Sequence, residues 1–142
     1  MLAAVCLASA AEKPDFSGNW IVNLDRSNFG KAPKPTSMSL KVTRNGDVMH
    51  AVQTTNSQAG SSTTESDWVI DGKEHDTTGT TAGKTLARWE GNTLYSERKS
   101  NDGSLEQTIW LTLSADGRTA NEKVVGKGPE GTNTSRLIWE RQ

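Results

Sequence analysis

The sequence predicts an all-β domain, an antiparallel up-and-down β-barrel of about eight to ten strands. Three observations predict it. Glycine-containing turn signals divide the chain at short intervals, apolar and polar residues alternate between them, and no segment has a sustained helical period of apolar residues. The 142 residues are the usual length of a single domain.

Six strong turn signals combine Gly with Asn, Asp or Glu. Gly, Asn and Asp accept the positive φ that tight hairpin turns require. Two weaker breaks, at residues 58–62 and 79–83, bring the series to eight, which separates nine strands; one N-terminal strand precedes them. The strong signals are Asn45-Gly46-Asp47, Asp71-Gly72-Lys73, Glu90-Gly91-Asn92, Asn101-Asp102-Gly103, Ala115-Asp116-Gly117 and Pro129-Glu130-Gly131.

Each strand is justified by its flanking turns and by side chains that share one face, as in a strand with one buried side. The segments around 48–54 and 73–78 are less apolar than the others. In chain order the clearest apolar faces are Trp20, Val22 and Leu24; Met38, Leu40 and Val42; Leu105, Ile109, Leu111 and Leu113 in the eighth strand; and Leu137 with Trp139 and Arg141 in the last.

Closure of the sheet follows from what an open sheet would expose. Ten strands in an open meander would leave two unpaired edges and one uncovered apolar face, and no helix is predicted to cover them. A closed barrel removes both problems. Its interior is either filled by side chains or shared with one small ligand, and the function depends on which.

Residues 25–36, DRSNFGKAPKPT, form the one long irregular connection. Pro33 and Pro35 lie close together within it. One interpretation is a surface loop between the first strand and the meander; the other is a flap across one mouth of the barrel.

Residues 1–11, MLAAVCLASAA, are predicted to be a signal peptide, because small residues end the run at Ala8-Ser9-Ala10. A lipid anchor at Cys6 is a weaker alternative. We therefore expect a single barrel domain over residues 12–142, secreted or periplasmic. Without Cys6 the remaining chain contains no cysteine, which excludes disulfides and thiolate metal sites.

Composition excludes two classes of partner. Sixteen basic and 17 acidic residues give a net charge of -1, so nothing indicates nucleic-acid binding. The mean hydropathy is -0.66, and no stretch approaches the roughly 18 apolar residues of a membrane span.

The two ends of the predicted barrel carry a resemblance. Phe16-Ser17-Gly18-Asn19-Trp20, an F-x-G-x-W motif, resembles the N-terminal signature of the calycin superfamily, the lipocalins and fatty-acid-binding proteins. Leu137-Ile138-Trp139-Glu140-Arg141 is similar to the end of the last strand in the fatty-acid-binding branch. The chain also resembles small exported bacterial lipocalin-like proteins. It lacks the helix pair that fatty-acid-binding proteins insert after their first strand.

The resemblance implies how the barrel closes. In the superfamily a basic residue of the last strand lies over the first-strand Trp, so Arg141 would cover Trp20 beside Trp139, with Arg136 as the alternate donor. A guanidinium over an indole contributes about 0.5–2 kcal/mol. Leu137 stands where the ligand-binding arginine of fatty-acid-binding proteins would align.

Five tryptophans are spread over different strands, and two explanations stay open. Large rings fill the taper of a barrel core, or they line a pocket for a flat or apolar ligand. In the second case an arginine orients the polar end of the ligand, although the Glu97-Arg98-Lys99 cluster also has the composition of a solvated strand end. The candidate ligand-binding residues are Trp68, Trp89, Trp110, Arg88 and Arg98.

The face that Trp110 occupies depends on strand register. If the apolar set of the eighth strand points inward, Trp110 points outward as a surface or interface aromatic. In the other register Trp110 points inward with Thr108 and Thr112, which gives a more polar cavity.

No residue pattern indicates catalysis or a metal site. His50 and His75 lack ligand spacing, no G-x-S-x-G occurs, and carboxylate pairs such as Glu65 and Asp67 have no apolar pocket in the sequence. We expect no cofactor.

The expected function is non-covalent binding of a small apolar or aromatic molecule in the barrel interior. The alternatives are a packed structural or protein-interaction barrel and, third, an enzyme.

Overall fold

A computed structural model of the chain describes residues 13–77 and 82–142, which form ten β-strands and no helix. The predicted signal peptide, residues 1–11, lies outside the described residues, as do residues 78–81 in one predicted break. The strands are β1 (Gly18–Val22), β2 (Ser37–Asn45), β3 (Val48–Ser57), β4 (Gly60–Val69), β5 (Glu74–Asp76), β6 (Gly83–Glu90), β7 (Thr93–Ser100), β8 (Glu106–Leu113), β9 (Thr119–Gly128) and β10 (Gly131–Arg141).

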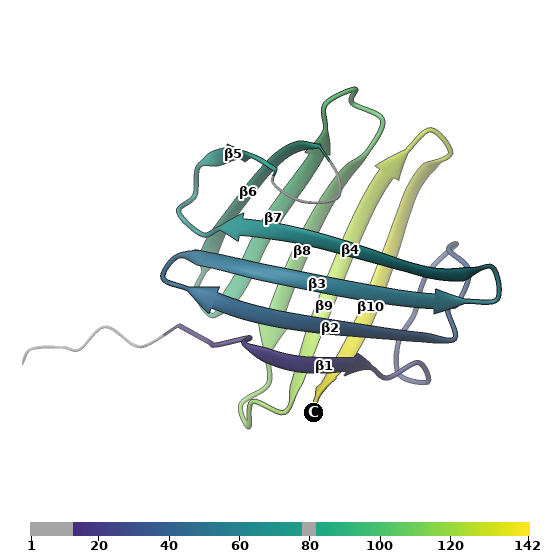
Figure 1. Cartoon of the computed structure of the whole chain (residues 1–142), viewed down its shortest axis with the longest axis horizontal. Coiled ribbons are helices and arrows are strands. Elements are labelled where there is room, and N and C mark those ends of the chain that lie inside the picture. Colours follow the sequence, from purple (N-terminus) through teal and green to yellow (C-terminus); the bar gives the residue numbers. More distant parts are fainter. Residues whose placement is uncertain (1–12, 78–81) are drawn as a thin grey trace, which may run out of the picture.

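The strands form one antiparallel sheet in the order β4-β3-β2-β1-β10-β9-β8-β7-β6-β5. Figure 1 shows that this sheet curls so that β1 to β4 cross steeply over β6 to β10. Each pair in that order is consecutive in sequence except β1 and β10, which join the two ends of the chain. The predicted up-and-down barrel is confirmed.

The barrel is nearly closed, with a seam between β4 and β6. No ladder of the described residues joins these strands; instead a single parallel bridge pairs Ile70 with Ala87. The backbone N–H of Gly72 also donates to the carbonyl of Ala87 at 2.8 Å. Backbone hydrogen bonds between the described residues on the two sides of the seam therefore lie at one end of it only.

The predicted glycine turns set the two ends of the barrel. Gly46 and Gly91 adopt φ angles of 60° and 61° between β2 and β3 and between β6 and β7, where an L side chain would be strained. These two turns and the one at Gly117 lie at one end, called here the closed end. The segment 23–36 and the turns after β3, β7 and β9 lie at the other, the loop end (Figure 1).

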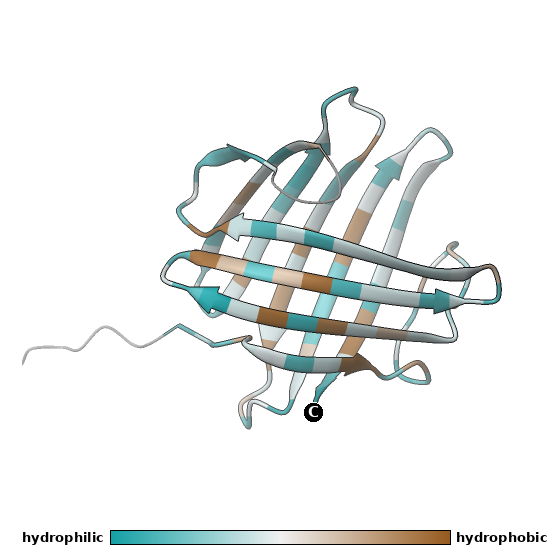
Figure 2. Ribbon diagram, viewed as in Figure 1, coloured by the Kyte–Doolittle hydropathy of each residue, from teal (hydrophilic) through white to brown (hydrophobic). Residues whose placement is uncertain are grey.

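Alternation along the strands separates interior from exterior, as Figure 2 shows by the changing hydropathy along β2 and β3. In β2, Met38 and Val42 are buried whereas Ser39 and Lys41 are exposed. The period of two residues predicts this separation, because successive side chains of a strand point to opposite faces.

Aromatic side chains fill the closed end. Trp139 is fully buried and Trp20 is 2% exposed, and the Trp20 Nε1–H donates to the carbonyl of Phe16 at 2.9 Å. Phe16 in turn stacks on Trp89, with ring centroids 6.3 Å apart. These rings close one end of the barrel and leave its other end to the loops.

Arg141 connects the two ends of the chain. Its guanidinium carbon lies 4.3 Å from the centre of the Trp20 ring. Its N–H groups donate to the carbonyls of Gly117 at 2.8 Å and Asp15 at 3.0 Å, and to that of Ser17. The structure thus places the residues of the expected closure together, with Trp139 buried beside them in the core cluster.

Candidate functional site

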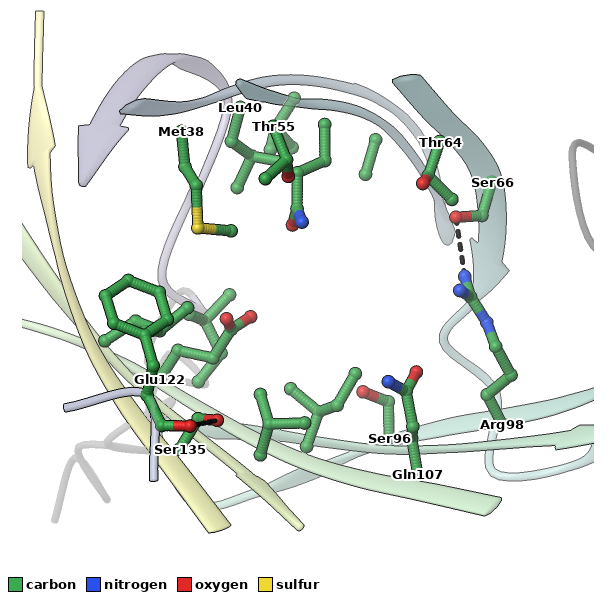
Figure 3. Close-up of a pocket in the computed structure, with 18 of the residues that line it drawn as sticks. Met38, Leu40, Thr55, Thr64, Ser66, Ser96, Arg98, Gln107, Glu122 and Ser135 are labelled. Atoms are coloured by element: carbon green, nitrogen blue, oxygen red, sulfur yellow. Dashed lines mark hydrogen bonds between the residues drawn. The ribbon is translucent and has the colours of Figure 1, made fainter. Parts of the chain in front are cut away.

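The barrel interior is hollow and encloses a cavity of about 550 Å³. This volume lies within the range of about 300–1,000 Å³ that is common for small-molecule sites. Side chains of β2, β3, β4, β7, β8, β9 and β10 line it, and Figure 3 shows them converging on an open centre. Its apolar walls toward the closed end are formed by Val42, Met49, Trp68, Leu94, Leu111 and Leu137.

Toward the loop end the lining contributed by β3, β4, β7 and β8 becomes polar. The inward-facing positions there carry amides and hydroxyls, among them those of Thr55 and Thr64 (Figure 3). The change follows from composition, because the outer half of β3 and β4 is rich in Thr, Ser, Asn and Gln. The cavity therefore runs from a mainly apolar floor to a mouth that is polar on the side of β3 and β4 and apolar on the side of Phe29, Pro35 and Met38.

The irregular segment between β1 and β2 lies at the mouth. Phe29 and Pro35 belong to the cavity lining, as the flap interpretation requires. The segment is fixed to β10: the backbones of Asn28 and Arg136 exchange two hydrogen bonds of 2.8 Å, and the amide N–H of Lys31 donates to Asn133 Oδ1 at 2.6 Å. It forms a fixed part of the wall.

Arg98 supplies the positive charge inside the cavity. It points inward from β7 across the seam, where Nη2 donates to the Ser66 hydroxyl of β4 at 2.6 Å (Figure 3). Its guanidinium carbon lies 4.9 Å from the centre of the Trp68 ring. Its Nε–H is buried and has no hydrogen-bond partner within the described residues, and burial lowers the pKa of Arg98. A buried donor without an acceptor is costly unless a ligand or water accepts from it.

Glu122 supplies a carboxyl group to the cavity, on the side opposite Arg98 in Figure 3. Its register partners are Leu111 on β8 and Leu137 on β10, both buried. The Trp139 Nε1–H donates to Oε1 at 3.4 Å, a long hydrogen bond. Burial among apolar groups raises the pKa of Glu122 to about 7, because removal from water disfavours the carboxylate.

Strand register separates the two polar side chains along the barrel. Glu122 is in the row that contains Leu111 and Leu94, whereas Arg98 lies four residues beyond Leu94 on β7. Four residues of strand span about 13 Å. Arg98 is therefore nearer the mouth, and Glu122 lies at the floor.

The structure divides the five predicted ligand-binding residues. Trp68 and Arg98 line the cavity; Trp89, Trp110 and Arg88 do not. The Arg98 placement also corrects the interpretation of Glu97-Arg98-Lys99 as a solvated strand end, since Arg98 points inward and its two neighbours point outward.

The three predicted residues that do not line the cavity lie in three different places. Trp89 stacks on Phe16 in the closed end, below the floor. Arg88 points outward and lies 4.3 Å from the Tyr95 ring. Trp110 points outward from β8, edge-on to Tyr95 at 5.7 Å and beneath Lys123 at 5.1 Å, which decides between the two registers left open by the sequence.

The sequence analysis missed Glu122. A signal exists in the alternation along β9, where Ala120, Glu122 and Val124 occupy one face and Asn121 and Lys123 the other. A carboxyl in an apolar alternation indicates an inward-facing acid. Its desolvation depends on leucines of two other strands, which no local pattern reveals.

No cluster of three or more His, Cys, Asp or Glu side chains suited to a metal ion occurs within residues 13–77 and 82–142. His50 points outward from β3, where Nε2 contacts Glu65 at 2.8 Å and Nδ1 contacts Asp67. The described residues also contain no helix that could cross a membrane.

The same fold occurs in solved structures of bile acid-binding, fatty acid-transporting and secretory abundant heat soluble proteins. The zebrafish ileal bile acid-binding protein, complexed with cholic acid, aligns with a TM-score of 0.61 at 17% identity, over 89% of this chain and 98% of its own. A secretory abundant heat soluble protein of Ramazzottius varieornatus aligns with a TM-score of 0.64 at 14% identity, over 93% and 98%. A point mutant of the fatty acid transporter REP1-NXSQ gives 0.58 at 17% identity, over 89% and 97%.

These similarities show the fold, an up-and-down β-barrel that the chain shares with these proteins. No protein-family model and no curated protein sequence matches the chain.

Proposed function

We propose that the protein binds a small, largely apolar molecule that carries an acidic group, non-covalently, inside the barrel. The observation that carries the proposal is Arg98, a half-buried side chain whose buried Nε–H has no partner among the described residues, on the wall of a cavity of about 550 Å³. Among the proteins of the same fold, one is a bile acid-binding protein complexed with cholic acid and one is a fatty acid transporter.

Binding has two physical components. The apolar body of the ligand is buried against Leu94, Leu111 and Met49, at about 25 cal/mol for each Å² removed from water. The acidic group accepts hydrogen bonds from Arg98, which are strong because both partners are charged and the site is partly desolvated. Ser66 fixes the guanidinium from β4 and thus orients it.

The packed structural barrel is the alternative. It requires an interior filled by side chains, and the cavity argues against it. It also requires exposed aromatics on the outer wall, whereas Trp110 is partly covered by Lys123 and Tyr95.

We further propose that the protein acts outside the cytoplasm, in the periplasm or the medium. The composition of residues 1–11 supports this proposal. Expression of the full chain in a bacterial host followed by N-terminal sequencing of the secreted or periplasmic fraction tests it. Cleavage after Ala10 or Ala11 is expected; an intact Met1 in the cytoplasmic fraction contradicts it.

Arg98 is expected to dominate the affinity for anionic ligands. Arg98→Leu should weaken the binding of dodecanoic and hexadecanoic acid about 10- to 100-fold, because it removes charge-assisted hydrogen bonds worth about 1.5–3 kcal/mol. Isothermal titration of the delipidated protein measures the affinity. Trp68 gives a second readout by its fluorescence, since the ligand displaces or reorients the guanidinium beside its ring.

Arg88→Leu is the matched control, because Arg88 is an arginine of the adjacent strand that points away from the cavity. It should leave the affinity unchanged. Equal losses in the two variants would indicate non-specific attraction of anions. Failure of the wild-type protein to bind any acid of the panel, cholic acid included, would overturn the proposed function.

A further inference from the structure

Glu122 is a polar group for which the proposed function has no use. It faces the cavity from β9 between two buried leucines, Leu111 and Leu137. Its one hydrogen bond to a described residue, from Trp139 at 3.4 Å, engages a single oxygen. The carboxyl therefore retains acceptor capacity directed at the cavity.

The charged groups that share the cavity do not pair with Glu122. Arg98 of β7 and Lys34 at the mouth are the other charged side chains in the lining, and among the described residues neither forms an ion pair with it. The elements packed against Glu122, β8 and β10, contribute Leu111, Leu137 and the Trp139 indole at this level. What is missing at the floor, within the described part of the chain, is a second hydrogen-bond donor, for the carboxyl oxygen that Trp139 does not engage.

Two polar groups at different depths constrain the shape of a ligand. Arg98 and the floor row of Glu122 are separated by four residues of strand, or about 13 Å. The inward-facing row between them contains the apolar side chains of Ile109 and Val124 and the hydroxyls of Ser96 and Ser135, but no charged group. A molecule that spans this interval has an acid near the mouth, an uncharged middle and a second polar group at the floor.

We propose that Glu122 forms a second polar subsite of the cavity, which accepts a hydroxyl group at the end of the ligand remote from Arg98. The ligand class is then the acids that carry a distal hydroxyl group, such as ω-hydroxy fatty acids. This inference rests on the proposed function, because it needs the acid held at Arg98.

A hydroxyl suits the site better than an amine for two reasons. It donates to the carboxylate and also exchanges hydrogen bonds with the neutral acid, so it is accepted on both sides of the pKa of about 7. An ammonium group would need the carboxylate as its counter-ion and would be left buried and unpaired whenever Glu122 is protonated, whereas a hydroxyl brings no charge into the cavity.

Matched ligand pairs test the inference. The full chain, delipidated, is titrated calorimetrically with dodecanoic and ω-hydroxydodecanoic acid, and with the corresponding hexadecanoic pair. In the wild-type protein the hydroxy acid of the better-fitting length should bind about three- to tenfold more tightly than the plain acid. Glu122→Leu should abolish or reverse this preference, whereas Glu122→Gln, which still accepts a hydrogen bond, should keep most of it.

Glu130→Gln, in the exposed turn between β9 and β10, is the control for loss of a carboxylate and should behave as wild type. Plain acids that bind while the hydroxy acids gain nothing would overturn the inference and leave the proposed function intact. A preference for ω-amino acids over the hydroxy acids would also overturn it. If no acid binds at all, the inference falls together with the proposed function.

Discussion

Glu122→Leu is expected to stabilise the protein by on the order of 3 kcal/mol at pH 8 and to remove a decline in stability between pH 5 and pH 8. Folding raises the pKa of Glu122 from its ordinary value near 4.5 to about 7. A difference of about 2.5 pH units corresponds to a free energy of this order. Leucine at this site would extend the apolar row of Leu111 and Leu137 without the cost of a buried charge.

The direction in which pH changes the free energy of unfolding follows from proton binding to Glu122. Between pH 4.5 and 7 the folded chain holds a proton on Glu122 that the unfolded chain has released, so the folded state is favoured by acid. This contribution is complete below about pH 4.5 and is lost as the pH rises through about 7. The native carboxyl is thus a stability cost at pH 8, of the kind that functional sites commonly carry.

Urea unfolding followed by tryptophan fluorescence at pH 5, 6, 7 and 8 measures the effect. His50 adds a pH dependence of its own, because its hydrogen bond to Asp67 and the charges of Asp67 and Glu65 raise its pKa in the folded protein. Subtracting the curve of the variant from that of wild type cancels this contribution. A difference that is constant with pH would mean that Glu122 is solvated in the folded protein.

Arg141→Ala is expected to lower the free energy of unfolding by about 3 kcal/mol. The substitution removes the cation over the Trp20 ring and the donors to the carbonyls of Gly117, Ser17 and Asp15. These carbonyls belong to the N-terminal segment and the turn between β8 and β9, so one side chain joins three parts of the closed end. The loss is a large fraction of the roughly 5–15 kcal/mol typical of a domain.

Thermal unfolding by circular dichroism and urea titration together test this expectation. Arg136→Ala is the control, because the Arg136 side chain is exposed and its backbone bonds to Asn28 are kept. Arg141→Lys should recover part of the stability through its charge but not the forked hydrogen bonds. Equal effects of the two alanine variants would show that Arg141 stabilises only through net charge.

The fold was predictable because its determinants are local. The turn at Gly46 and the alternation of Met38, Leu40 and Val42 are read from neighbouring residues, and both are present in the structure. Closure followed from a physical argument about exposed edges. The position of the seam could not be predicted in this way. It depends on the short pairing of β5 and the single bridge at Ile70, which in turn depend on how far the sheet can curl.

The site was only partly predictable, because its properties arise between strands. Trp68, one of the predicted ligand-binding residues, lines the cavity, whereas the side on which Trp110 lies depends on the register of β8, which the sequence left open. Arg98 lies within a charged triplet whose composition indicates solvent exposure, and its burial is caused by contacts across the seam. The pKa of Glu122 is raised by burial beside leucines of β8 and β10, which are distant in sequence.

The seam has a consequence for association between copies of the chain. β4 ends the sheet, so the described structure leaves one side of its backbone at the loop end without a ladder partner. An unpaired strand edge promotes aggregation by strand pairing when it is long, flat and apolar. Here residues 60–64 are Gly-Ser-Ser-Thr-Thr and are largely exposed, which offers hydrogen bonds but no apolar contacts to a second edge. The polar composition of this half-strand therefore disfavours edge-to-edge aggregation of a barrel that is not fully closed.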